Sequence, residues 1–293
     1  MTTYKYGAHQ FLWTEYWTDN SLYILEEVRL LGLDSFEISL GDDITFNSDT
    51  VKRRAMDLDI ELTVGPGNIW PMECDISSEK RENQLLGLEW HTKIIQKAAN
   101  LGAVAYNGAI YSHPGNILPK LKQSSDFDRI AHNLYKLATY ADRLNIKLVI
   151  EPMSRFRTHL VHTAQDAIDL ITLVKHPNLY VNLDTYHMVT EERDYAKAIK
   201  SCGSYLWGIH ACESDRGVPG GGLVPWDEVF SALSATCPNS RILMETYNTG
   251  ENGYGFKRGI FQNVCPDAND FVTLGLSFLK GKADELKLNK QTI

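Results

Sequence analysis

Short apolar runs alternate with longer, partly polar stretches along nearly the whole chain. Each apolar run is bounded by turn-forming residues, so we predict a β-strand at each. The eight predicted strands are residues 4–11, 35–40, 61–66, 103–110, 147–153, 179–184, 205–213 and 241–247. Their cores are nearly continuous in apolar character, which is typical of parallel strands covered by helices.

The stretches between the strands have helical spacing. Residues 21–32 show it clearly, with Gly32 as the predicted end and an apolar stripe of Leu22, Leu25, Val28 and Leu31. A longer helix is predicted over 77–102. Further helices are predicted to begin near Ser124, Thr163, Glu191 and Pro225 and after Asp267. Thr163 to Asp166 and Asp267 to Asp270 each contain a predicted N-terminal cap.

Eight strand-then-helix units predict an α/β fold, a TIM (β/α)8 barrel, for which about 250 residues is typical. A doubly wound open sheet is the structural alternative. That fold usually has a glycine-rich turn after its first strand, whereas here HQFLWTEYW occupies residues 9–17. Since no linker-like tract divides the 293 residues, we predict a single domain over 1–293 with a C-terminal helical segment at about 267–285.

Several strands end in a polar or ionisable residue at the same relative place. These residues are Glu37, Asn107, Glu151, Asp184, His210 and Glu245. In a barrel they would converge at the C-terminal face, where the active sites of this fold lie. One such residue alone could be a structural ion pair. The last four lie on successive strands, and their three carboxylates would repel one another unless a cation or protons intervene.

Two glutamates, one aspartate and one histidine form a hard, oxygen-rich set of donors. We therefore predict one divalent metal per chain, held by Glu151, Asp184, His210 and Glu245. Mn²⁺ is the expected ion, with Mg²⁺ and Co²⁺ as alternatives. Four protein ligands leave positions on an octahedral ion for water or a chelating substrate.

The composition narrows the classes of partner. A net charge of −8 disfavours a nucleic-acid partner. The N-terminal residues lack the layout of a signal peptide, and no apolar run approaches the roughly 20 residues that span a membrane. Five scattered cysteines without a CxxC pair are typical of a reduced compartment, so we expect a cytoplasmic location.

The motifs at these strand ends resemble those of the ketose 3-epimerases, the D-tagatose, D-psicose and L-ribulose 3-epimerases within the xylose-isomerase-like TIM barrels. The matching segments are Glu37–Gly41, Glu151–Phe156, Leu183–Met188, Gly208–Arg216, Pro225–Leu233 and Met244–Glu245. The similarity runs from the first strand to about residue 250. It implies the same four metal ligands, substrate contacts from His187 and Arg216, a small sugar substrate, and a homodimer or homotetramer.

The resemblance implies inversion of C3 of a ketose through a cis-enediolate. Glu151 and Glu245 would flank the substrate as the catalytic acid/base pair, and the metal would chelate the carbonyl oxygen and the adjacent hydroxyl. The same intermediate serves aldose–ketose isomerisation, so an isomerase or a keto-inositol-type dehydratase is an alternative. A non-catalytic sugar-binding module is the alternative outside enzymes.

Further substrate contacts are expected from Trp13, Glu37 and Arg157. Trp13 belongs to an aromatic segment, residues 11–17, that could form an apolar wall of the site. The family usually has glutamate where this chain has Arg157, and residues 246–259 also depart from its pattern. Arg157 could favour an anionic or glycosylated substrate, or it could pair with Glu15 or Asp215.

Overall fold

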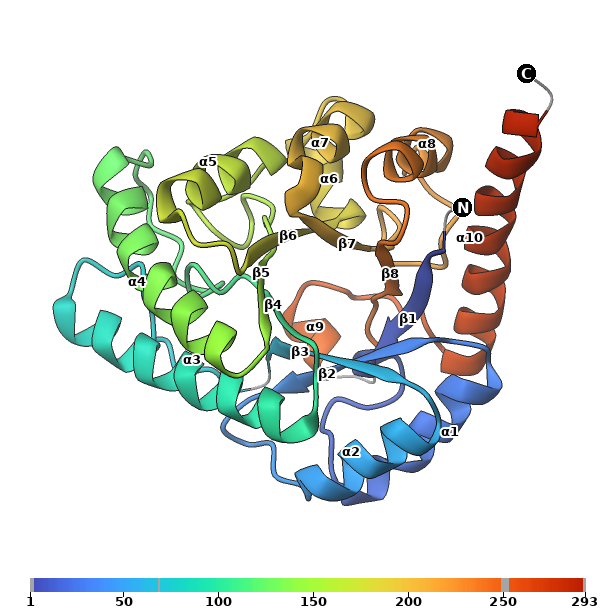
Figure 1. Cartoon of the computed structure of the whole chain (residues 1–293), viewed down its shortest axis with the longest axis horizontal. Coiled ribbons are helices and arrows are strands. Elements are labelled where there is room, and N and C mark those ends of the chain that lie inside the picture. The colour runs from blue at the N-terminus through green and yellow to red at the C-terminus, as the bar shows by residue number, and fades with distance from the viewer. Residues whose placement is uncertain (1–2, 68, 249–252, 292–293) are drawn as a thin grey trace.

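Eight parallel strands form a closed barrel in the computed structural model, which describes residues 3–67, 69–248 and 253–291 (Figure 1). This confirms the predicted (β/α)8 fold. Each strand pairs with the next along the chain, and β8 pairs with β1 to close the sheet. The strands are β1 (Lys5–His9), β2 (Ser35–Leu40), β3 (Glu61–Pro66), β4 (Ala105–Gly108), β5 (Lys147–Ile150), β6 (Leu179–Asp184), β7 (Leu206–His210) and β8 (Arg241–Met244).

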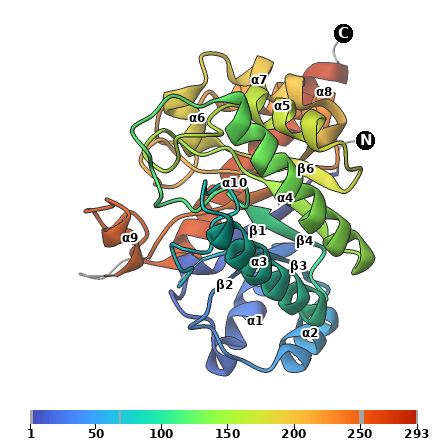
Figure 2. The same cartoon turned by 90° about the vertical axis from the view of Figure 1, so that its left-hand side faces the viewer.

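Helices surround the barrel and cover the outer face of the sheet (Figures 1 and 2). The α-helices of the described residues are α1 (Tyr23–Leu30), α2 (Ser48–Asp57), α3 (Arg81–Leu101), α4 (Ser124–Arg143), α5 (Ala164–Val174), α6 (Thr185–Glu191), α7 (Tyr195–Cys202), α8 (Trp226–Thr236), α9 (Tyr254–Lys257) and α10 (Ala268–Gln291). Both predicted caps are present. The Thr163 hydroxyl accepts from the Asp166 amide at 3.1 Å, and the Asp267 carboxylate accepts from the Asp270 amide at 2.8 Å.

Some helices differ from the prediction. The sequence pattern did not indicate α2, because this helix is largely polar and buries only Val51 and Ala55. The helix expected near Glu191 begins instead at Tyr195, where Asp194 caps it. A short helix, α6, precedes it and starts directly after β6 without a turn that would mark its beginning. Figure 2 shows α9, which the pattern also did not predict, projecting from one end of the barrel.

No helix in the described part of the chain is long and apolar enough to cross a membrane. The C-terminal helix α10 extends beyond the predicted segment and packs beside α8. The rings of Trp226 and Phe278 lie 6.0 Å apart there, and Lys282 pairs with Asp227 at 2.9 Å.

His91 on α3 is a fully buried histidine that makes stability depend on pH. Its Nδ1 atom lies 2.8 Å from the Tyr106 hydroxyl, and the rings of Trp70 and Trp90 lie 5.0 and 5.1 Å away. Burial lowers the pKa of His91 from 6.5 to about 3. Because the unfolded chain binds this proton more readily, we expect the free energy of unfolding to fall by about 1.4 kcal/mol per pH unit below 6.5 from this group.

Urea unfolding at pH 7.5 and pH 5.0 checks this expectation. The decrease in stability between the two pH values should be smaller in His91→Gln than in the wild type. His132→Gln, on the exposed face of α4, is the matched control and should keep the wild-type decrease. An equal decrease in wild type and His91→Gln would contradict the assignment to His91.

Candidate active site

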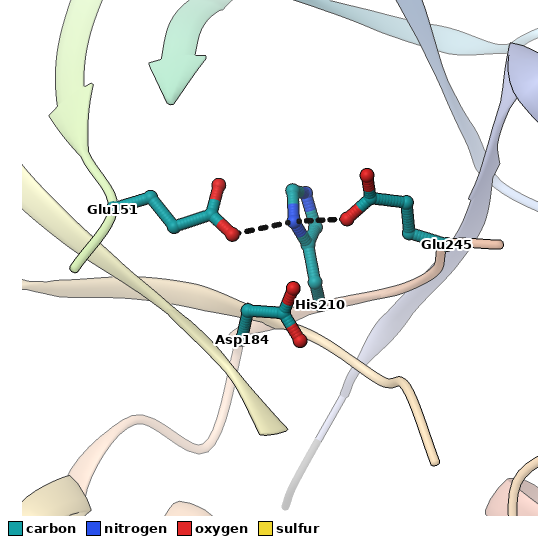
Figure 3. A group of neighbouring side chains, drawn as sticks. All are labelled: Glu151, Asp184, His210 and Glu245. Atoms are coloured by element: carbon teal, nitrogen blue, oxygen red, sulfur yellow. Dashed lines mark hydrogen bonds and ion pairs between the residues drawn. The ribbon is translucent and has the colours of Figure 1, made fainter. Parts of the chain in front are cut away.

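The ends of four neighbouring strands bring together the predicted metal ligands. Glu151 directly follows β5, Asp184 ends β6, His210 ends β7, and Glu245 directly follows β8. The register of the sheet pairs Asp184 with His210. Each of the four offers one ligand atom, and these atoms all lie within 4.8 Å of one another. Figure 3 shows Glu151 and Glu245 facing His210 from opposite sides.

The donor set fits a hard divalent ion. His210 Nδ1 lies 3.2 Å from Glu151 Oε1 and 3.2 Å from Glu245 Oε2, and Asp184 completes a group of three carboxylates, of which Glu151 and Asp184 are buried and Glu245 is partly buried. Burial, together with the charges of Asp184 and Glu245, raises the pKa of Glu151 to about 7. A bound cation would offset this repulsion, and oxygen-rich donors are those that Mn²⁺, Mg²⁺ and Co²⁺ accept.

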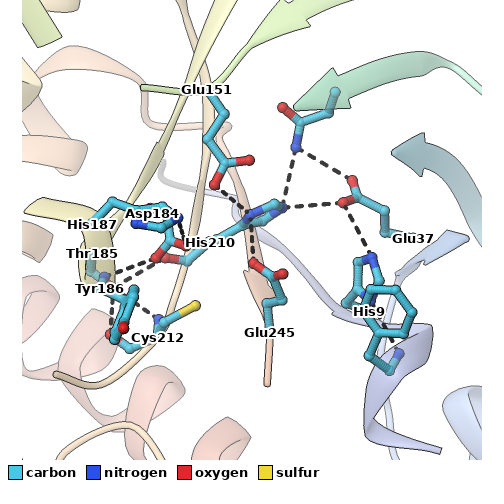
Figure 4. A network of polar contacts seen from close by, with 12 residues as sticks. His9, Glu37, Glu151, Asp184, Thr185, Tyr186, His187, His210, Cys212 and Glu245 are labelled. Atoms are coloured by element: carbon cyan, nitrogen blue, oxygen red, sulfur yellow. Dashed lines mark hydrogen bonds and ion pairs between the residues drawn. The ribbon is translucent and has the colours of Figure 1, made fainter. Parts of the chain in front are cut away.

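A further carboxylate, that of Glu37, lies at the Nε2 side of the His210 ring and orients it (Figure 4). Its Nε2 atom lies 3.3 Å from Glu37 Oε1 and 3.2 Å from Asn107 Nδ2, so Nδ1 faces the other three ligands. Burial raises the pKa of Glu37, but the charge of His210 outweighs this and lowers it overall. Carboxylates that hold a metal-binding histidine in this way fix its tautomer and its ring orientation.

Arg216 connects two of the candidate ligands. Its guanidinium donates to Asp184 Oδ2 at 2.7 Å and to Glu245 Oε2 at 3.0 Å. The same side chain donates to Cys212 Sγ at 2.8 Å and lies 4.4 Å from the centre of the Tyr186 ring. Despite burial, this charge and that of His210 hold the pKa of Glu245 well below its usual range.

His187, on α6, lies beside the cluster. Its Nε2 atom is 3.7 Å from Asp184 Oδ2, and burial lowers the pKa of His187 to about 4. The imidazole is therefore neutral at pH 7. Its buried Nδ1 atom has no hydrogen-bond partner within the described ranges of the chain, so a ligand in the cavity could supply one.

A cavity of about 340 Å³ lies at this end of the barrel. The predicted site residues that line it are Glu37, Glu151, Arg157, His187, His210, Arg216 and Glu245. Aromatic side chains form much of the wall, among them Phe11, Trp70 and Tyr247. Residues of α9 and the segment after it also line the cavity, from Tyr254 to Ile260.

The structure places Trp13 elsewhere. Trp13 is not among the lining residues; its Nε1 atom donates to Asn269 Oδ1 at 3.0 Å, and its ring packs 5.8 Å from Phe36. Trp17, in the same aromatic segment, is fully buried against Phe36 at 5.5 Å. Only Phe11 of the aromatic residues in that segment lines the cavity, because the chain turns outward after β1.

His9 lines the cavity and was missed from the sequence. It ends β1, and its Nε2 atom lies 3.9 Å from Glu37 Oε1. Applying to the first strand the rule that selected the other polar strand ends would have identified it. The sequence reasoning also missed Arg258, which follows α9 and carries no recognisable motif.

Comparisons with known proteins agree with this geometry. The sequence profile of the family described as xylose isomerase-like TIM barrel matches residues 25–261 of this chain. A D-psicose 3-epimerase from Ruminiclostridium cellulolyticum is 31% identical over 271 residues, which cover 91% of this chain and 92% of that protein. An L-ribulose 3-epimerase from Mesorhizobium japonicum is 26% identical, covering 96% of this chain and 97% of that protein.

A solved structure is also similar along almost the whole chain. It is the D-psicose 3-epimerase with D-tagatose from Clostridium cellulolyticum H10, which is 27% identical to this chain. The TM-score is 0.86, and the match covers 95% of this chain and 99% of that one.

Proposed function

This chain belongs to the xylose isomerase-like TIM barrels and, among them, to the ketose 3-epimerases, and from that membership we propose that it inverts C3 of a ketose with the help of one divalent metal. The observation that carries the proposal is the pair Glu151 and Glu245, which face the same point from opposite sides (Figure 3). Inversion beside a carbonyl needs one group to remove the C3 proton and another to return a proton to the opposite face.

The protein groups at this pair are suited to moving a proton. Burial raises the pKa of Glu151 to about 7, whereas Arg216 and His210 hold the pKa of Glu245 low despite its burial. The two carboxyl groups therefore have different electrostatic surroundings, and a bound divalent ion would lower the pKa of both. A divalent ion held by Glu151, Asp184, His210 and Glu245 would supply positive charge to the oxyanion that develops as C3 loses its proton.

Other residues would bind and orient the sugar. We assign substrate contacts to His187, whose Nδ1 atom is available, and to Arg216 and Glu37, which line the cavity. The aromatic wall would exclude water from the reacting carbon.

Mn²⁺ is the proposed ion, with Mg²⁺ and Co²⁺ as alternatives, because the donors are oxygen-rich and hard. We also propose a homodimer or homotetramer by analogy with other barrels of this type. A cytoplasmic location is proposed from the cysteines, all five of which are free thiols in the structure.

Isotope exchange tests the proposed reaction. The metal-loaded protein is incubated with D-fructose, D-psicose and D-tagatose in deuterated water, and the products are followed by NMR. We expect the C3 epimer of the substrate, carrying solvent deuterium at C3. An aldose labelled at C2 would indicate an isomerase, and a dehydrated product would indicate a dehydratase. Sugar binding without C3 exchange of any ketose, neutral or anionic, would support the binding module and would refute the proposed function.

A further inference from the structure

We propose that the natural substrate is an anionic ketose, which carries a carboxylate or a phosphate. Arg157 and Arg258 would hold this group. The inference rests on the proposed C3 epimerase function and names the substrate class for the same cavity.

Arg157 is a cationic side chain of the cavity without an anionic partner. It lies on the segment after β5, lines the cavity and is partly buried. Its side chain forms no ion pair with a carboxylate in the described part of the chain, so the expected pairing with Glu15 or Asp215 is absent. The groups that influence its guanidinium electrostatically are Arg216 and the hydroxyls of Tyr186 and Tyr247. Removing a charge from water without a partner is costly, so a bound anion here would be favourable.

Arg258 brings a second guanidinium to the same cavity. It follows α9, lies over the Tyr254 ring at 4.4 Å and donates to the Tyr254 hydroxyl. Burial and the charge of Arg157 together lower the pKa of Arg258 to about 10, although Tyr247 opposes this. The two arginines come from distant parts of the chain but line the same cavity, so their charges repel each other.

The other charged side chains of the cavity lie near groups of opposite charge. The carboxylates around His210 face that imidazole, Arg216 and the proposed ion. Lys257 lies near the Glu15 carboxylate. Lys257 is exposed, whereas Arg157 and Arg258 are the partly buried cations of this cavity, within the described residues, that form no ion pair with a carboxylate.

Two guanidinium groups match the geometry of a carboxylate or a phosphate, because each can donate two parallel hydrogen bonds. A neutral ketose offers hydroxyls but no negative charge to compensate the two guanidinium charges. The cavity volume of about 340 Å³ is at the small end of the range for ligand sites. This size favours one monosaccharide with a small anionic group over a glycosylated sugar with a second ring.

Substrate comparison with arginine variants tests the proposal. The value of kcat/KM for C3 epimerisation is measured for D-fructose, its 6-carboxylate counterpart D-fructuronate, D-fructose 6-phosphate and D-fructose 1-phosphate. The value of kcat/KM of the wild type should be about tenfold or more higher for one anionic ketose than for D-fructose. The identity of the preferred ketose shows whether the anionic group is a carboxylate or a phosphate. Arg157→Gln and Arg258→Gln should each lower kcat/KM for that substrate about tenfold to a hundredfold and change the value for D-fructose far less.

Arg155→Gln is the matched control, because Arg155 is exposed, pairs with Glu191 at 3.0 Å and does not line the cavity. It should keep the wild-type preference. Calorimetry gives a readout without turnover: the preferred anionic ketose should bind metal-free wild type and Arg155→Gln more tightly than Arg157→Gln.

Two results would overturn the anionic substrate and leave the epimerase intact. One is equal or better turnover of D-fructose by the wild type. The other is a preference for anionic ketoses that survives in both Arg157→Gln and Arg258→Gln. Absence of C3 exchange with every ketose, neutral or anionic, would overturn the epimerase proposal and this inference together.

Discussion

Replacing Glu151 by glutamine is expected to lower kcat for epimerisation about 10²- to 10⁴-fold, the range for removal of a general acid or base. Glutamine keeps the shape of the side chain but cannot take or return a proton. The same loss is expected for Glu245→Gln, because each glutamate would serve one face of C3.

The two variants should differ in the epimer whose C3 hydrogen they still exchange with solvent. Glu151→Gln should exchange the C3 hydrogen only of the epimer whose hydrogen faces Glu245, and Glu245→Gln only of the other epimer. NMR in deuterated water, started from each epimer separately, measures this directly. The metal content of each variant is determined in parallel, because both residues are candidate ligands.

Glu228→Gln, an exposed carboxylate on α8, is the control for these variants and should retain wild-type turnover. Epimerisation within about twofold of wild type in either active-site variant would be incompatible with a two-base mechanism through this pair.

Removing the divalent metal with a chelator is expected to abolish epimerisation and to destabilise the folded protein. Without the ion, three carboxylates, two buried and one partly buried, repel one another around His210. Restoring an ion at a hundred times its dissociation constant should increase the free energy of unfolding by about 2.7 kcal/mol. Elemental analysis of the purified protein and thermal unfolding with Mn²⁺, Mg²⁺ and Co²⁺ measure these effects and rank the ions.

Asp184→Asn should weaken the stabilisation by metal, because it removes one charged ligand. Asp227→Asn is its matched control, since Asp227 is exposed on α8 and should leave the response to metal unchanged. Full activity after complete chelation, or the same metal response in Asp184→Asn as in the wild type, would be inconsistent with an ion at this position.

Local sequence patterns were sufficient to predict the barrel and the group of candidate ligands. Strand periodicity, apolar stripes and caps such as the one at Thr163 are local signals. They predict a strand or a helix whichever other elements it packs against. Convergence of Glu151, Asp184, His210 and Glu245 then follows from the fold, because parallel strands in a barrel end at one face. The local signal failed for α2 and α9, the first largely polar and the second a single turn.

Contacts between side chains across the barrel could not be predicted from the local sequence and are known only from the folded chain. Glu37 contacts His210, and Trp13 packs against Phe36 rather than lining the cavity, because closure of the sheet and the path of each loop set these partners. The placement of Arg157 and Arg258 in one cavity is likewise absent from any local pattern. Such contacts join residues far apart in sequence, so their geometry depends on how all the elements pack together.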